Sequence, residues 1–228
     1  MKPFTLVEGY AAPIMQDNID TDVIVRIERI AKLKRGQFAP WAFEALRYLP
    51  DGSEDPNFLL NRDPFRNAQI LIAGANFGCG SSREMAVWSI QEFGIRCIVA
   101  QSFGDIFYGN CLQNGVLPIR LERDQINVLT KGALTGTTVR VDLRICKIWT
   151  AATGPIEFAI PDTQREALLS GLDEVAQTLN MTASIDQFQQ EDRRGRPWVY
   201  AAVDAAMKTP DVAQRLKVKS TVELESDV

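Results

Sequence analysis

The sequence predicts an α/β domain built around a βαβ core, and three observations carry that prediction. Residues 69–74 form a short apolar run typical of a buried strand. Apolar residues then recur at helical spacing as far as Phe93, and Gly94 ends the pattern. A second apolar run follows at residues 95–100. A strand, a helix and a strand within about thirty residues predict a parallel, right-handed pair of strands.

The N-terminal part of the chain is expected to add two short strands, at residues 4–9 and 23–27, with the polar loop 16–22 between them. That loop is rich in aspartate and ends at Asp22. Two interpretations of it stay open. The loop is either an Asx-type turn with solvated carboxylates or the source of a carboxylate that faces an active site.

Residues 29–67 show no clear periodicity and separate two predicted strands. A long excursion between strands of a compact domain is typical of a functional lid or a mobile segment. The basic run Arg29–Arg35 lies at its start. That run either supplies a cation to a substrate carboxylate or forms a solvated helix face.

The turn between the central strand and its helix is built to approach a ligand closely. Gly78 and Gly80 permit positive φ and leave room beside the backbone. Ser81, followed three residues later by Glu84, makes a capping-box pattern, which predicts Ser81 as the N-cap of the helix. A helix N-terminus attracts anions through its unpaired N–H groups and its dipole.

Ser82 and Arg83 complete this candidate site. A guanidinium offers a forked pair of donors that suits a carboxylate. The loop therefore predicts an anion site, while a plain helix cap beside a solvated Arg83–Glu84 pair remains the alternative. The phosphate loop of nucleotide-binding enzymes is excluded, because no Gly-Lys-Ser/Thr follows.

The remaining elements continue the α/β pattern and then change to antiparallel strands. Residues 102–115 are expected to form a loop with a short helix, residues 116–121 a strand and residues 122–131 a helix. Short β-rich runs predict an antiparallel meander, and a helix interrupted near Gly171 follows. The three runs are residues 137–143, 145–149 and 156–160, and the helix is residues 161–178. We expect one domain over residues 1–198 and a C-terminal extension at 199–228.

Composition excludes several classes of protein. The chain has 228 residues, is 46% hydrophobic and carries a net charge of −4, which suits a globular protein without a dedicated nucleic-acid-binding function. No apolar run is long enough to span a membrane, and the first residues lack the apolar core of a signal peptide. We therefore expect a cytoplasmic protein that binds neither nucleic acid nor membrane.

The chain contains no histidine, so a Ser-His-Asp triad, a Cys-His pair and a His-ligated zinc are all excluded. Its four cysteines form no Cys-x-x-Cys pair, which argues against a cluster or zinc site built from this chain alone. Cys97 and Cys146 lie in apolar runs and are expected to be buried. Cys79 lies in the glycine loop and is expected to be a neutral thiol.

Four motifs, in order along residues 4–198, resemble the small subunits of 3-isopropylmalate dehydratase in the aconitase superfamily. They are Asn18–Asp22, Asn76–Glu84, Asp105–Asn110 and Gly171–Asp173. The resemblance implies a swivelling β/β/α domain with mixed sheets. It also implies that this chain binds no cofactor itself and works with a separate large subunit that carries a [4Fe–4S] cluster.

The resemblance further implies a hydro-lyase that moves a hydroxyl between adjacent carbons of a small dicarboxylate through an alkene, as in leucine biosynthesis. Ser81 would then be the base that removes the carbon-bound proton. Gly80, Ser82 and Arg83 would bind a substrate carboxylate, and Asp22 would face the same cavity as a second catalytic residue. An alkoxide at Ser81 needs stabilisation, which the helix mouth, nearby N–H groups and Arg83 are suited to provide.

The sequence departs from the family pattern at two of these motifs. Met85-Ala86-Val87 replaces the usual His-Ala-Pro, and Val23-Ile24-Val25-Arg26 replaces an Ile-Ile-Pro run. Arg26 and the altered lid leave a second substrate open, namely another 2-substituted malate of methylmalate or homocitrate type. A non-catalytic carboxylate-binding module is the alternative from another class.

Overall fold

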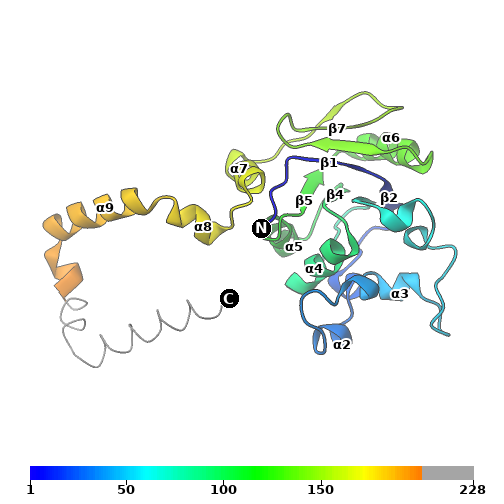
Figure 1. Ribbon diagram of the computed structural model, residues 1–228, viewed down its shortest axis with the longest axis horizontal. Coiled ribbons are helices and arrows are strands. Elements are labelled where there is room, and N and C mark those ends of the chain that lie inside the picture. Colours follow the sequence, from blue (N-terminus) through cyan, green and yellow to red (C-terminus); the bar gives the residue numbers. More distant parts are fainter. Residues whose placement is uncertain (202–228) are drawn as a thin grey trace. The chain divides into compact units, whose positions relative to one another are not determined.

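A computed structural model describes residues 1–201 (Figure 1). The first compact unit is Met1–Glu174, and a second begins at Val175. The boundary predicted at residue 198 remains a prediction. All but the first three residues of the expected extension 199–228 lie outside the described part of the chain.

A four-stranded parallel sheet forms the centre of the first unit, with the strand order β2-β3-β4-β5. Its strands are β2 (Ala11–Ile14), β3 (Ile70–Ala73), β4 (Cys97–Ala100) and β5 (Leu117–Arg120). Helix α4 (Glu84–Phe93) joins β3 to β4, which confirms the predicted parallel βαβ unit. Helix α5 (Asp105–Gln113) joins β4 to β5 and is longer than the short helix expected there.

A second sheet, of four antiparallel strands, has the order β1-β6-β7-β8. Its strands are β1 (Leu6–Gly9), β6 (Val139–Asp142), β7 (Lys147–Thr150) and β8 (Ile156–Glu157). The predicted meander is therefore confirmed, and the N-terminal strand closes its other edge. Helix α6 (Arg123–Leu134) leads into this sheet and begins with a capping box made by Glu122 and Gln125.

The parallel sheet has an apolar core on each face. Leu71 of β3 and Ile98 of β4 pack toward α4 and α5, whereas Ile70 and Val99 pack toward the antiparallel sheet and α6. This alternation follows from the two-residue period of a strand buried on both faces. Figure 1 shows the resulting order of layers, from the antiparallel sheet through the parallel sheet to the helices. The predicted β/β/α architecture is confirmed.

The expected lid, residues 29–67, consists of short helices and turns that cover α4. Its elements are the end of α2 (Ile27–Ile30), η1 (Ala39–Trp41), α3 (Glu44–Arg47), η2 (Leu59–Asn61) and η3 (Phe65–Asn67). Phe38, Phe43 and Leu60 are fully buried in the core beneath α4. Burial of large apolar side chains anchors this segment. Movement as a lid remains a prediction.

The prediction of a strand at residues 23–27 is wrong, because the chain forms helix α1 (Thr21–Ile24) there. The Asp20 side chain accepts a hydrogen bond from the Val23 backbone N–H at 2.8 Å and caps this helical turn. The cap overrides the β-propensity of three successive β-branched residues. The strand that pairs with β3 is instead β2, which was not predicted.

Helix α7 (Asp162–Ser170) ends at Gly171, as expected. Gly171 has φ +71°, and a Cβ there would stand 2.7 Å from the Met1 carbonyl oxygen. Helix α8 (Glu174–Leu179) crosses the boundary between the units, and α9 (Thr182–Gly195) belongs to the second. Neither α8 nor α9 has a buried residue. Within residues 1–201, no helix is long and apolar enough to cross a membrane.

Candidate active site

The candidate site lies where three loops leave the carboxyl ends of β2, β3 and β4. The loop after β3 pairs on one side with the loop after β2, through the bridge Asp20–Cys79. It pairs on its other side with the loop after β4, through the bridge Phe77–Phe103. The carboxyl edge of a parallel sheet is where α/β proteins usually bind ligands. Backbone pairing thus holds the candidate loop in place between its neighbours.

Glycine is required in this loop, as the sequence predicts. Gly78 has φ +71° and Gly80 has φ +93°, both in the left-handed region. A Cβ on Gly78 would stand 2.2 Å from the ring of Phe107. The Gly78 N–H donates to the Ile19 carbonyl at 2.7 Å. The loop therefore keeps its backbone close to both neighbours.

The prediction that Ser81 caps the central helix is wrong. Helix α4 begins at Glu84 with Arg83 as its N-cap, and no side chain caps it. The Ser81 carbonyl accepts instead from the Arg83 N–H at 2.8 Å and from the Thr21 hydroxyl at 3.1 Å. These bonds hold Ser81 in the loop rather than in the first helical turn. Sequence reasoning did not single out Thr21, because its partner is distant in the chain.

Ser81 and Ser82 are both exposed. Within residues 1–201, neither hydroxyl makes a hydrogen bond. The hydroxyl oxygen of a capping serine would accept a hydrogen bond from a backbone N–H. The loss of the cap therefore leaves Ser81 available to a ligand.

Asp22 and Arg83 form an ion pair, which brings together two of the predicted site residues. The Arg83 side chain is 15% exposed and that of Asp22 is 55% exposed. The buried Nη1 atom of Arg83 faces the carboxylate without forming a well-directed hydrogen bond. Asp20 caps α1 through its side chain. The interpretation of the loop as an Asx-type turn therefore holds for Asp20 and not for Asp22. The guanidinium is held from one side and keeps further donors for a second carboxylate.

Arg29, considered as a cation for a substrate, is engaged within the lid. Its Nε and Nη2 donate to the Glu44 carboxylate at 3.0 and 2.6 Å, and its guanidinium stacks 3.4 Å from the centre of the Trp41 ring. The hydrogen bond from Arg29 lowers the pKa of Glu44, against a smaller opposing effect of burial. Arg29 is therefore neither free nor simply solvated, and the two interpretations of the run Arg29–Arg35 remain predictions.

Two adjoining hollows lie near the start of the lid, and Asp22 lines the smaller one. The smaller, of about 340 Å³, is lined by residues that include Asp22, Val23 and Arg26. The larger, of about 810 Å³, is lined by Arg26 and by lid residues that include Trp41. Arg26 and Ala45 line both hollows. The lid thus provides room for a small ligand next to the candidate site.

The cysteines do not form a metal centre in the described part of the chain. Cys97 is fully buried, as predicted, and burial raises its pKa and that of Cys111 well above the ordinary value. Cys146 is only half-buried, contrary to prediction, because it lies in the turn before β7 at φ +51°. Across residues 1–201, no three His, Cys, Asp or Glu side chains gather to hold a metal ion.

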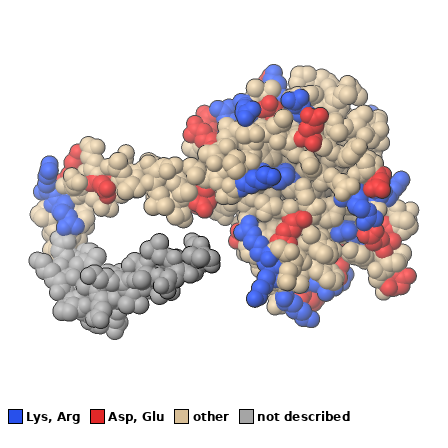
Figure 2. Space-filling view, viewed as in Figure 1, with Lys and Arg blue, Asp and Glu red and all other residues tan. Residues whose placement is uncertain are grey.

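Charges of both signs are mixed over the surface of the first unit. Figure 2 shows Lys and Arg beside Asp and Glu on the face in view. Dedicated nucleic-acid binders instead carry a continuous basic patch. The expectation that the chain binds no nucleic acid remains a prediction, with this face in its favour.

Comparison with known proteins gives consistent matches. The family model of the aconitase C-terminal domain matches residues 1–124. The 3-isopropylmalate dehydratase small subunit of Roseobacter denitrificans is 43% identical over 201 residues, which cover 87% of this chain and 100% of that protein. The small subunit of the same name from Rhodopseudomonas palustris strain HaA2 is 44% identical over 200 residues, with the same coverage.

A solved structure also matches. The crystal structure of 3-isopropylmalate dehydratase from Methanocaldococcus jannaschii has a TM-score of 0.60 and 27% sequence identity. The match covers 81% of this chain and 99% of that one. The likeness therefore extends over almost the whole of the archaeal protein.

Proposed function

Since the chain belongs to the family of 3-isopropylmalate dehydratase small subunits, we propose that it is the small subunit of a cytoplasmic hydro-lyase. The enzyme interconverts 2-isopropylmalate and 3-isopropylmalate by dehydration and rehydration, in leucine biosynthesis. The names of the relatives favour this substrate over a methylmalate or homocitrate type and over a non-catalytic binding module. The resemblance stated from the motifs is confirmed.

One observation carries the mechanism: the Asp22–Arg83 ion pair beside the exposed Ser81. Arg83 is fixed by Asp22 and offers its remaining donors to a substrate carboxylate as a forked pair. Ser82 adjoins Arg83 in the loop, and Gly80, with φ +93°, lies two residues before Ser82. A carboxylate bound there places the substrate against the Ser81 hydroxyl.

In the proposed reaction, Ser81 removes the proton from one carbon of the substrate while the hydroxyl leaves the neighbouring carbon. The products are an alkene and water, and the return reaction adds them in the opposite orientation. A serine alkoxide needs positive charge and N–H donors nearby. Because α4 begins three residues beyond Ser81, Arg83 and the loop N–H groups supply this support rather than the helix terminus.

The proposal places a [4Fe–4S] cluster on a separate large subunit. A cluster bound there would supply Lewis-acid chemistry for the hydroxyl that leaves the substrate. This division suits a chain without histidine, whose cysteines Cys97 and Cys111 are fully buried. The task of this chain is to bind the carboxylate and move the carbon-bound proton.

The test is anaerobic turnover by this chain co-expressed with its cluster-loaded large subunit. We expect alkene absorbance to rise fastest with 2-isopropylmalate and more slowly with methyl-substituted malates. Ser81→Ala should lower kcat by about 10² to 10⁴ while the complex still assembles, because general-base catalysis contributes that much. A kcat near the wild-type value would remove Ser81 from this role. No turnover of any malate would favour a binding module.

A further inference from the structure

The amide of Asn114 is buried where three elements of the first unit meet. Its side-chain oxygen accepts from Trp88 Nε1 at 3.0 Å and from Arg35 Nη2 at 3.1 Å. Its side-chain nitrogen donates to Glu84 Oε1 and to the Asn110 carbonyl, both at 2.9 Å. An asparagine side chain has two donors and two acceptor positions, so every one of them is used.

The partners of Asn114 connect the start of the lid to the candidate site. Arg35 lies in the lid, and Asn114 itself ends α5. Glu84 is the first residue of α4 and directly follows Arg83. No aspartate can replace this amide, because aspartate supplies no donor for Glu84. No apolar side chain can replace it either, since the buried partners would be left unpaired.

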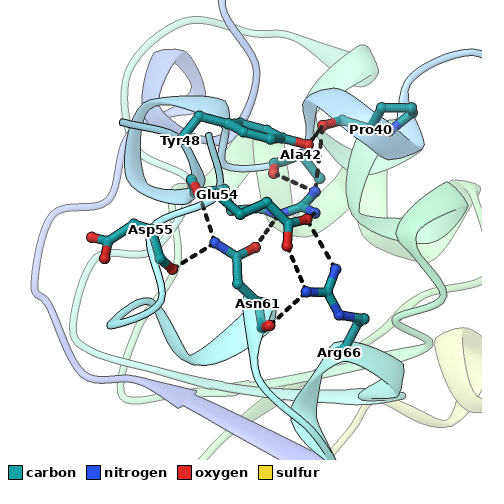
Figure 3. Close-up of polar contacts among 8 residues, drawn as sticks. Pro40, Ala42, Tyr48, Glu54, Asp55, Asn61 and Arg66 are labelled. Atoms are coloured by element: carbon teal, nitrogen blue, oxygen red, sulfur yellow. Dashed lines mark hydrogen bonds and ion pairs between the residues drawn. The ribbon is translucent and has the colours of Figure 1, made fainter. Parts of the chain in front are cut away.

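A second buried amide of the same kind provides a contrast. Asn61 accepts from Arg47 Nε at 3.0 Å and donates to the carbonyls of Arg47 and Asp55. Figure 3 shows that these contacts stay among the lid residues. Asn114 is 5% exposed and Asn61 is 8% exposed, so the two differ in what they connect rather than in burial.

We infer that Asn114 is a positioning residue for Arg83. By holding Glu84, it sets the direction of the first turn of α4 and so the place from which Arg83 reaches toward Asp22. By holding Arg35, it keeps the start of the lid in the same arrangement. The inference rests on the proposed function only where it assigns Arg83 to a substrate carboxylate.

The start of the lid has an independent attachment to α4. Glu92 near the end of that helix accepts from the N–H groups of Gly36 and Phe38, each at 2.6 Å. Phe38 is buried and packs beside Trp88 with ring centres 6.1 Å apart. A change at Asn114 therefore leaves the lid attached and acts on the first turn of α4.

The test uses Asn114→Asp, which keeps the shape of the side chain and removes both donors. The new carboxylate faces that of Glu84, and like charges at this distance repel. We expect kcat/KM on 2-isopropylmalate to fall about tenfold or more, mainly through KM, because misplacing a binding group weakens substrate positioning. Glu84→Gln added to Asn114→Asp restores a donor across the Glu84 contact but not to the Asn110 carbonyl, so kcat/KM should recover at least about threefold from the value of Asn114→Asp, toward that of Glu84→Gln alone.

Asn61→Asp is the matched control, because it makes the same change in an equally buried amide without a link to Glu84. It should lower the unfolding temperature and leave kcat/KM of the folded complex within about threefold of wild type. Equal losses of kcat/KM in Asn114→Asp and Asn61→Asp would overturn the inference. Failure of Glu84→Gln to restore kcat/KM in an assembled complex would overturn it as well.

A spectroscopic readout separates this inference from the proposed function. In the ¹⁵N-labelled full chain, the side-chain Nε–H signal of Arg83 should move in Asn114→Asp, return in the double variant and stay in place in Asn61→Asp. An Arg83 signal that does not move in Asn114→Asp contradicts the inference whether or not the enzyme turns over. Absence of wild-type turnover on 2-isopropylmalate, with the Arg83 signal shifted as expected, counts against the proposed function alone.

Discussion

Two arginines of the first unit, Arg47 in the lid and Arg83 at the candidate site, use the same side chain in different ways. Arg47 is 5% exposed and donates from Nε to Asn61 and from Nη1 toward the carbonyls of Pro40 and Ala42. Figure 3 shows the polar network around this position. Each donor group of Arg47 has a protein partner nearby.

The Arg47 network is completed by a carboxylate at its edge. Glu54 lies 3.5 Å from Arg47 Nη2 and also pairs with the exposed Arg66. Burial lowers the pKa of Arg47, and Glu54 acts against that effect. Because its hydrogen bonds run to backbone and side-chain groups of the lid, Arg47 holds residues 40–61 together.

Arg83 has one carboxylate partner, Asp22, and that partner is more than half exposed. A guanidinium has five N–H donors, so this single partner does not use all of them. A guanidinium with all its donors satisfied, as at Arg47, stabilises the fold. We propose that Arg83, which is paired on a single side, binds a substrate carboxylate with its remaining donors. Four predictions test this difference, in order of expected effect.

Arg83→Lys should give the largest loss, and the loss should be in activity. Lysine keeps the charge but cannot form a forked pair with a carboxylate. Loss of a hydrogen bond to a charged group costs about 1.5–3 kcal/mol, which lowers kcat/KM about 10- to 150-fold. Steady-state kinetics of the assembled complex measures this change. An unchanged kcat/KM would mean that Arg83 does not bind the substrate carboxylate.

Arg47→Met should reverse the pattern, with a loss of stability and little loss of activity. The change leaves the Asn61 oxygen and lid carbonyls without their donor, at a cost of about 2 kcal/mol in the free energy of unfolding. Denaturant unfolding measures that cost, while kcat/KM of the folded complex should stay within about threefold of wild type. A large loss of kcat/KM in a fully folded Arg47→Met complex would mean that Arg47 also contributes to activity and does not differ from Arg83 in this respect.

Glu44→Gln should have a smaller effect that depends on pH. The hydrogen bond from Arg29 lowers the pKa of Glu44 in the folded protein, below the value of about 4.3 for an unfolded glutamate. Its stabilisation is therefore complete above that value and is lost as pH falls through the folded-state pKa. The variant should be less stable than wild type at pH 7, and the difference should shrink on acidification. Denaturant unfolding of both proteins between pH 7 and pH 3 measures this difference. A difference in the free energy of unfolding that stays constant over this range would contradict the linkage.

Arg66→Ala should have the smallest effect. Arg66 pairs with Glu54 through two hydrogen bonds at 2.9 and 2.5 Å and donates to the Asn61 carbonyl at 2.6 Å, but the Arg66 and Glu54 side chains are substantially exposed. Exposed ion pairs contribute little to stability. The melting temperature should stay close to the wild-type value and well above that of Arg47→Met. A fall in melting temperature as large as that of Arg47→Met would mean that the exposed contacts of Arg66 stabilise the fold as much as the buried contacts of Arg47 do.

Local patterns in the sequence predicted the parallel strands β3, β4 and β5, the antiparallel meander and the position of the candidate loop. Apolar runs at residues 70–73 and 97–100 are local signals, because a strand buried on both faces needs continuous apolar residues. Gly78 and Gly80 were predictable for the same reason, since positive φ is a property of one residue. The family resemblance also rests on short local motifs.

Which side chains meet depends on tertiary packing and does not follow from local patterns. The β-branched run at residues 23–25 predicted a strand, yet the Asp20 cap made a helical turn. Ser81 matched a capping pattern, yet its carbonyl is held by Thr21, sixty residues earlier in the chain. The Asp22–Arg83 pair and the contacts of Asn114 likewise join distant segments. Local propensity encodes elements, whereas such contacts depend on how those elements pack, which no local pattern records.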